Sequence, residues 1–163
     1  MSKYVETICT RAKVSSHTAG NYKTRQKNNA LVALMSEIRS NKSRIIKHNE
    51  KDVKAASRDK LNDSFIDRLV LNKTRIQNMI DGIEKIIEIE DIVFQISKTH
   101  TQHSGIYTAQ MRVPIGVIFM IYESRPNVTI DAAALCLKSN NSVILRGGSE
   151  SIHTNALLIS LIR

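Results

Sequence analysis

The segment VPIGVIFMIYESRPN, from Val113 to Asn127, decides the fold of this chain. Its apolar run from Ile115 to Ile121 has the length of a strand and almost no polar atoms, which is typical of a parallel strand buried on both faces. A helix must cover such a strand. Residues 128–138 follow a short turn and are apolar nearly all round, as expected of a crossover helix wedged between two layers.

A second strand and a second helix come next along the chain. Val143 to Leu145 is short and apolar, Arg146 to Ser149 contains two glycines, and the residues after it carry isoleucine and leucine at helical spacing. The order is strand, helix, strand, helix, with the right-handed crossover that parallel strands adopt. The sequence therefore predicts an α/β fold in which residues 113–163 form an incomplete βαβα, Rossmann-like unit.

The chain before this unit is helical in pattern. Apolar residues recur at three- and four-residue spacing, and polar breaks and caps separate the stripes. The predicted helices cover residues 5–20, 24–40 and 43–58, a short turn at Phe65–Leu69, and a longer helix capped by Asn72 or Thr74. We expect this N-terminal helical segment to occupy residues 1–92.

Between residues 93 and 112 the hydrophobic period changes to two. Two alternating runs flank His103-Ser104-Gly105, so the pattern predicts a β-hairpin. Two strands alone are marginal in water. We therefore expect the hairpin to pair with another part of the fold or with another subunit.

Composition limits the class of protein. The 163 residues suit one domain, and no apolar run reaches the length of a membrane span or has the pattern of a signal peptide. We therefore expect a cytoplasmic protein without a membrane partner. The net charge is +9, but residues 1–92 hold eighteen Lys and Arg against twelve Asp and Glu, alternating along helices as on a solvated surface. Nucleic-acid binding is not expected.

The turn Arg146-Gly147-Gly148-Ser149 is the first candidate site. A helix N-terminus offers free N–H groups, adjacent glycines let an anion approach the backbone, and Arg146 would add a charged contact to a phosphate or ribose. The pattern alone is equally that of a plain strand-to-helix turn, and neither a Rossmann fingerprint nor a Walker loop is present.

The turn after the first strand is the second candidate. It lies at the carboxyl end of a parallel strand, where open α/β sheets bind ligands. The side-chain amide of Asn127 would stabilise a developing oxyanion, and Arg125 is available for an anionic substrate group. The simpler interpretation is that Asn127 caps the following helix.

The histidines and cysteines give weaker indications of a functional site. His100 and His103 lie three apart beside a hairpin turn, and further ligands are lacking, so no metal site is predicted. Cys136 lies in the most apolar helix and is interpreted as a core residue. Cys9 and Cys136 are too few for a disulfide framework.

Four motifs together carry a resemblance to a known family. They are VPIGVI (113–118), IYESRPNVT (121–129), LCLK (135–138) and VILRGGSE (143–150), preceded by Asp67-Arg68-Leu69. This set closely resembles γ-glutamyl phosphate reductase, a member of the aldehyde dehydrogenase superfamily, and covers essentially the whole chain.

The resemblance implies an oxidoreductase of proline biosynthesis that reduces L-glutamyl 5-phosphate to L-glutamate 5-semialdehyde with NADPH, through a thioester on a cysteine. By position, Asn127 matches the oxyanion-hole asparagine. Arg146 matches the basic residue at the adenosine ribose or its 2′-phosphate, and Gly147, Gly148 and Ser149 line the same turn. Arg125 is a candidate substrate contact, and the hairpin matches part of the oligomerisation region.

Departures from the family pattern limit what this chain is expected to do. Members of the family run on with the rest of the cofactor domain and a catalytic domain holding the nucleophilic cysteine. We therefore expect the chain to be inactive alone and to need a C-terminal half or self-association. Phe119 stands where the family has glycine, with an expected overpacking cost of about 1 kcal/mol or more. Asn140 and Ser142 replace small residues.

A second hypothesis comes from another class of function. The chain could act as a non-enzymatic interaction protein that uses its helical half or its basic surface. A salt-dependent nucleic-acid titration or a pull-down discriminates between the two.

Overall fold

The computed structural model describes residues 2–163 and contains helical, hairpin and parallel-strand parts in the predicted order. The N-terminal helices are α1 (Lys3–Ala19), α2 (Thr24–Ser40), α3 (Lys42–Arg58), α4 (Asp63–Leu69) and α5 (Lys73–Glu88). Two hairpin strands follow, β1 (Ile96–Thr101) and β2 (Tyr107–Met111). The last part is β3 (Val117–Ile121), α6 (Pro126–Lys138), β4 (Ser142–Arg146), the short 3₁₀ turn η1 (Ser149–Ser151) and α7 (Ile152–Ile162). The predicted fold class is confirmed.

Local signals explain where the middle helices begin. The side chain of Asn62 accepts a hydrogen bond from the Phe65 amide at the start of α4, and Asn72 accepts one from the Arg75 amide at the start of α5. Each satisfies an amide that would otherwise lack a partner in the first helical turn. Of the two caps proposed for α5, Asn72 is therefore the one used.

The parallel strands pair in a simple register. Val117 lies opposite Ser142 and Ile121 opposite Arg146, without a bulge between them. Gly116 directly precedes β3, and its φ of +109° is a conformation that disfavours side chains; its amide donates to the side chain of Asn141 over 2.8 Å. This fixes the entry of β3 against the loop that leads into β4.

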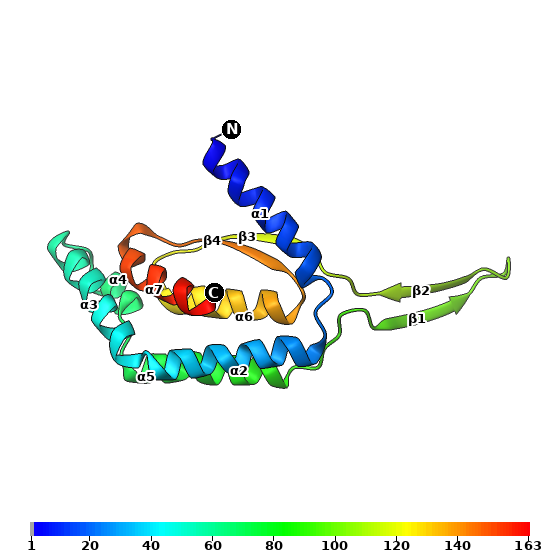
Figure 1. The fold of residues 1–163 in the computed structure, drawn as a ribbon, viewed down its shortest axis with the longest axis horizontal. Coiled ribbons are helices and arrows are strands. Elements are labelled where there is room, and N and C mark those ends of the chain that lie inside the picture. Colours follow the sequence, from blue (N-terminus) through cyan, green and yellow to red (C-terminus); the bar gives the residue numbers. More distant parts are fainter. Residues whose placement is uncertain (1) are drawn as a thin grey trace.

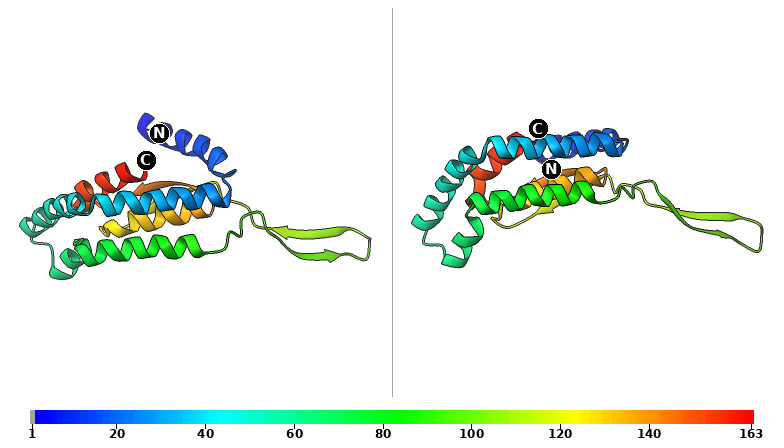
Figure 2. Two further views of the ribbon diagram at one scale, coloured as in Figure 1. Left: turned by 60° about the horizontal axis from the view of Figure 1, so that its bottom comes forward. Right: turned by 90° about the horizontal axis from the view of Figure 1, so that it is seen from below.

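The elements form layers around the strand pair (Figure 1). Helix α1 lies over one face of β3 and β4, and α6 lies against the other, followed by α2 and α5. The further views agree that α2 and α5 run side by side and that the hairpin projects from the body (Figure 2). The carboxyl ends of β3 and β4 and the N-terminus of α6 therefore meet at one edge of the molecule.

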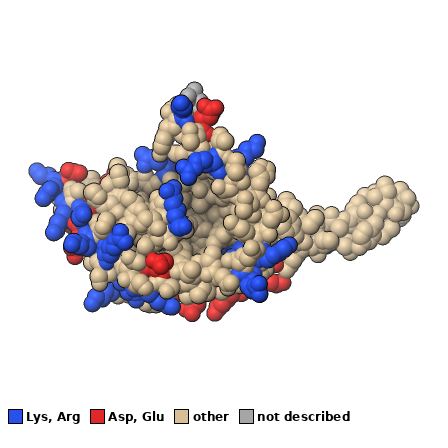
Figure 3. Space-filling model, in the orientation of Figure 1, with Lys and Arg blue, Asp and Glu red and all other residues tan. Residues whose placement is uncertain are grey.

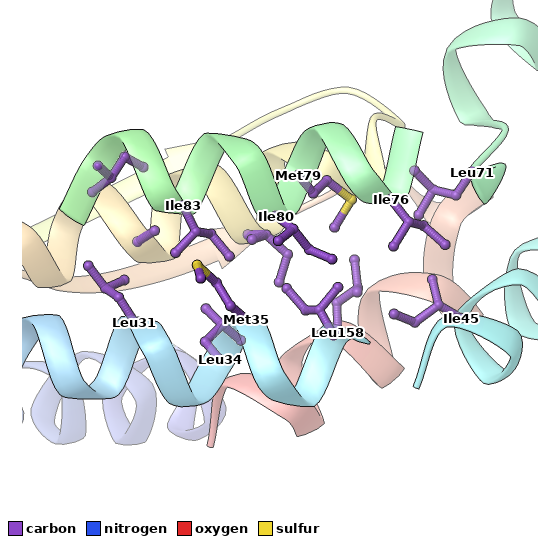
Figure 4. Packing of buried hydrophobic residues seen from close by; sticks show 14 of the residues in the cluster. Leu31, Leu34, Met35, Ile45, Leu71, Ile76, Met79, Ile80, Ile83 and Leu158 are labelled. Atoms are coloured by element: carbon purple, nitrogen blue, oxygen red, sulfur yellow. The ribbon is translucent and has the colours of Figure 1, made fainter. Parts of the chain in front are cut away.

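The hydrophobic core lies between these helices rather than within the sheet. Ile76, Met79, Ile80 and Ile83 of α5 face Leu31, Leu34 and Met35 of α2, and Leu158 of α7 fills the space between them (Figure 4). Ile130 and Ala134 of α6 belong to the same cluster. Fully burying a side chain of this size stabilises the fold by roughly 1.5–3 kcal/mol. The core therefore joins the N-terminal helices to the unit that carries the candidate site.

The hairpin has no core of its own. All residues of β1 and β2 are exposed, and the antiparallel register shifts between Ser97 and His100, where Lys98 has φ of +50°. A bulge of this kind breaks the strict alternation read from the sequence. The turn is closed by Gly105, whose φ is +83°.

One expectation about the first parallel strand is wrong. The sequence predicted burial on both faces, but Ile121 is 72% exposed and Ile115, before the strand begins, is 81% exposed. Phe119 is 60% exposed, so its ring causes no overpacking in the structure. The physical reason is that, within residues 2–163, β3 pairs only with β4 and has an unpaired edge, while Ile115 and Phe119 border the open groove beside α1.

The two later helices are also less enclosed than expected. Leu135 of α6, a helix expected to be wedged between two layers, is 50% exposed, and Ile152 at the start of α7 is 61% exposed. Cys136 is 4% exposed, as predicted for a core residue. Helix α6 therefore packs against α5, α7, β4 and α2, and Leu135 lies on its remaining, exposed side.

Two further observations concern the charge of the surface and the hydropathy of the helices. Lys and Arg side chains gather over α3 on the face shown in Figure 3, whereas the projecting hairpin shows none on that face. Among residues 2–163, no helix is long and apolar enough to cross a membrane.

Candidate functional site

Two turns meet at the carboxyl ends of β3 and β4. The Tyr122 amide donates to the Arg146 carbonyl over 3.1 Å and extends the ladder beyond the last strand residue. The Ser124 hydroxyl then donates to Glu150 over 2.6 Å, joining the first turn to the second. This hydrogen bond is the largest cause that holds the pKa of Glu150 below its usual value. The two candidate turns are therefore one connected structure.

Asn127 is placed by the start of α6. The helix begins at Pro126, whose ring suits the first helical position, and Arg125 occupies the N-cap without a side-chain hydrogen bond. Asn127 is thus inside the first turn, and its amide donates to Asp131 over 3.2 Å. The simpler interpretation of Asn127 as a helix cap is wrong, because capping requires the residue that precedes the first turn.

A cleft opens beside Asn127. It has a volume of about 420 Å³ and lies between the α4–α5 junction and the start of α6. Arg125, Asn127 and Asp131 line one wall, and Arg68, Arg75 and Asn78 are among the residues of the other. Asn127 and Arg125, predicted as one candidate turn, therefore line the same cleft at the carboxyl end of a parallel strand.

The Gly147–Gly148 turn is packed by the chain's own side chains. A β-carbon on Gly147 would contact the Asn155 amide and lie 3.0 Å from the Tyr122 hydroxyl. A β-carbon on Gly148 would contact the Ser124 hydroxyl and lie 2.6 Å from the Glu150 carboxylate. Neither glycine has a positive φ. Close packing therefore explains both glycines without an approaching anion.

Arg146 faces a different space from Asn127. Its side chain is exposed, donates to the Gly147 carbonyl, and borders an apolar groove of about 800 Å³ between α1 and the strands. Phe119 and Ile115 also line this groove. Ser149 begins η1 at the same turn. The structure therefore groups Arg146 with the glycines and Ser149, apart from the cleft that holds Asn127.

A chain of hydrogen bonds behind the turns was not found from the sequence. The Tyr122 hydroxyl lies 2.6 Å from the Thr129 hydroxyl, Thr129 donates to Asn155 over 2.9 Å, and Asn155 donates to Ser151 over 2.8 Å. Thr129 and Asn155 are buried on otherwise apolar helices. Polar residues at such positions were the available signal, because buried polar groups need partners.

Among residues 2–163, the histidines and cysteines do not form a second candidate site. His100 and His103 are exposed on and beside the hairpin, and within residues 2–163 no group of three metal-ligating side chains comes together. Burial raises the pKa of the Cys136 thiol, and neither cysteine lines the cleft that holds Asn127. A buried thiol with a raised pKa is a weak nucleophile.

These features define an α/β protein whose parallel strands end at a cleft and a tightly packed glycine turn, the place where proteins of this class bind ligands. No protein-family model matches the chain. Individual relatives match nearly all of it. It is 44% identical to the γ-glutamyl phosphate reductase of Alkaliphilus oremlandii over 98% of this chain and 39% of that protein. It is 44% identical to that of Hydrogenobaculum sp. over 100% of this chain and 37% of that protein.

Comparison with solved structures finds similarity to the same kind of reductase. The γ-glutamyl phosphate reductase of Thermotoga maritima superposes with a TM-score of 0.89 at 36% identity, over 94% of this chain and 37% of that one. The reductase of Saccharomyces cerevisiae gives a TM-score of 0.91 at 29% identity, over 96% and 40%. The chain therefore matches the N-terminal part of these γ-glutamyl phosphate reductases, as its sequence motifs indicate. It spans about two fifths of the length of these relatives.

Proposed function

We propose that this chain supplies the N-terminal part of a cytoplasmic, NADPH-dependent reductase. The reaction converts L-glutamyl 5-phosphate into L-glutamate 5-semialdehyde and releases phosphate, as a step of proline biosynthesis. The observation that carries the proposal is the position of Asn127 in a cleft at the carboxyl end of β3, in a chain 44% identical to named reductases.

Asn127 is proposed to stabilise charge on the substrate. When a nucleophile adds to an acyl phosphate, the carbonyl oxygen becomes negative, and a fixed amide donor stabilises it without reorganisation. The side-chain amide of Asn127 has two N–H groups, and only the bond to Asp131 uses one of them. That bond orients the amide and leaves the second N–H free to donate.

The nucleophile is proposed to come from residues other than those of this chain. Cys136 is buried and its pKa is raised by burial, so it is mostly a thiol at neutral pH. Cys9 is exposed on α1 and lines the groove on the far side of the strands from α6. Since neither is placed at Asn127, the chain by itself is expected to have no turnover.

Arg146 is the proposed contact for the cofactor. NADPH would supply the hydride, and the part that distinguishes it from NADH is the 2′-phosphate on its adenosine ribose. Among residues 2–163, the exposed Arg146 guanidinium is hydrogen-bonded only to the neighbouring Gly147 carbonyl, so it can pair with this phosphate, and the adjacent apolar groove suits an aromatic base. Gly147, Gly148 and Ser149 hold Arg146 at the turn.

The hairpin and the exposed strand face are the proposed partner surfaces. All residues of the hairpin's strands are exposed, with Ile96 at 65% and Tyr107 at 67%. The parallel sheet has two strands and unpaired edges. Unpaired edges and apolar faces favour pairing with another polypeptide, either a C-terminal half or a second copy.

A cofactor titration tests the proposal. NADPH and NADH are added separately to the purified chain and to Arg146→Gln, and binding is followed by nicotinamide fluorescence. The chain should prefer NADPH, and Arg146→Gln should weaken NADPH binding about tenfold, which equals about 1.4 kcal/mol, while NADH changes little. Arg58→Gln, at an exposed end of α3, is the matched control. Equal binding of both cofactors, or no effect of Arg146→Gln, would contradict the role of Arg146.

A further inference from the structure

Charged side chains line the cleft beside Asn127. Its volume of about 420 Å³ is within the range of small-ligand pockets. Arg68 and Arg75 come from the α4–α5 junction, Arg125 is the N-cap of α6, and Asp131 comes from the N-terminal half of that helix. The cleft is therefore lined by both positively and negatively charged side chains.

Two of the three arginines are already engaged. Arg75 donates to Asp67 over 2.8 Å and to the Val70 carbonyl over 3.0 Å. Arg68 lies 3.4 Å from Glu123. Among residues 2–163, Arg125 makes no side-chain hydrogen bond or ion pair, so its guanidinium remains available for a carboxylate. Bidentate pairing of this kind is what an arginine fork favours.

Asp131 also has no charged partner, and it is a carboxylate rather than a cation: among residues 2–163 it forms no ion pair. It is half-buried on α6, its Oδ2 accepts one hydrogen bond from Asn127, and its Oδ1 faces Gly82 of α5. Burial raises the pKa of Asp131, and within the described chain no Lys or Arg pairs with it. A carboxylate kept half-buried in a cleft is stabilised by a ligand that brings its own positive charge.

We infer that this cleft recognises the α-amino-acid end of the substrate, with Arg125 binding the α-carboxylate and Asp131 the α-ammonium. The inference rests on the proposed function and adds specificity to it. A ligand held at both charges would have its side-chain carbonyl directed to Asn127, which is hydrogen-bonded to Asp131. Asp131 then has two tasks, orienting the Asn127 amide and selecting ligands that carry an ammonium group.

Ligand titrations separate these tasks. The isotope-labelled full chain is titrated with L-glutamate and with glutarate, which lacks the ammonium, and backbone amide shifts around Arg125 and Asp131 are followed by NMR. L-glutamate should bind about tenfold more tightly than glutarate. Asp131→Asn keeps an oxygen that accepts from Asn127 but removes the charge, so it should abolish this preference while leaving glutarate binding unchanged. Arg125→Gln should weaken both ligands.

Arg58→Gln and Asp59→Asn, exposed residues at the end of α3, are matched controls expected to change nothing. Equal affinity for the two ligands overturns the inference, as does a preference that survives Asp131→Asn. Absence of any shift with L-glutamate at tens of millimolar overturns it too. None of these results affects the NADPH titration, so failure of this inference is distinguishable from failure of the proposed function.

Discussion

The Lys27 ammonium lies 2.6 Å from the Asp91 carboxylate, and the Lys27 side chain is 1% exposed. Lys27 also donates to the Asn140 side chain and, over 3.0 Å, to the Lys138 carbonyl. Asn140, with φ of +59°, in turn donates to backbone carbonyls after α1, including that of Tyr22 at 2.9 Å. One buried lysine thus joins α2, the segment after α5 and the end of α6.

Replacing this lysine should destabilise the chain strongly. Lys27→Met removes the cation, leaving Asp91 without its ion-pair partner and the Asn140 oxygen without the Lys27 donor, which we expect to cost about 3 kcal/mol or more. That is a large share of a typical domain's stability. Urea unfolding followed by circular dichroism measures it. Lys54→Met, at an exposed position of α3, is the control and should change stability little; equal effects of the two variants would contradict this role.

Acid should weaken the same contact. Desolvation acts to raise the pKa of Asp91, but hydrogen bonds from Lys27, Thr24 and the Val93 amide outweigh it and bring the pKa below its usual 3.8. A carboxyl with a lowered folded pKa contributes stability above its unfolded pKa and loses it as the pH falls through the folded value. The free energy of unfolding should therefore fall below about pH 4. Asp91→Asn should show a smaller loss across that range; an unchanged pH slope would refute the assignment.

The contacts of Lys27 could not be predicted from the sequence, whereas the helices that carry them could. Stripes of apolar residues spaced by three and four predicted α2 and α5, and a cap at Asn72 or Thr74 was predicted for the start of α5, because these signals are local. Lys27 and Asn140 are 113 residues apart, and nothing near either one indicates their contact. In the same way, the apolar run of β3 indicated a strand but not which faces would be covered, since coverage depends on partners distant in the sequence or outside the chain.

The candidate site was predictable to a similar degree. Motif order placed Asn127, Arg125 and Arg146 at the ends of two strands, and the structure places those strand ends together. It could not be read from the sequence that the glycines make room for Tyr122 and Ser124. The carboxylate of Asp131 was also missed, because an acidic residue on a helix looks like a solvated one until its neighbours are known.

The glycine turn gives a stability prediction. Gly147→Ala should destabilise the chain by about 1–3 kcal/mol, because the added carbon meets the Asn155 amide and the Tyr122 ring. Gly82→Ala is the matched control. Its added carbon would have 3.9 Å to the Asp131 carboxylate, and alanine in the middle of α5 should stabilise the helix by about 0.5–1 kcal/mol. Thermal denaturation of both variants checks the opposite signs; a neutral Gly147→Ala would show that the turn is loosely packed.

The two cysteines should react at very different rates. Cys9 is exposed, whereas Cys136 is buried and burial raises the pKa of its thiol. A chromogenic disulfide reagent at neutral pH should modify one thiol quickly and the second only after denaturant is added. Cys9→Ser should remove the fast phase. A fast reaction in Cys9→Ser would contradict the buried position of Cys136.

The most direct test of the whole account is turnover with and without the rest of the enzyme. The chain is assayed for NADPH formation from L-glutamate 5-semialdehyde, phosphate and NADP⁺, first alone and then co-expressed with the remaining region of the Hydrogenobaculum relative, which this chain matches over 37% of its length. We predict no turnover alone, turnover in the complemented assembly, and a loss in kcat of about 10²–10³-fold on Asn127→Ala. Turnover by the isolated chain, or full activity of Asn127→Ala in the assembly, would contradict the account.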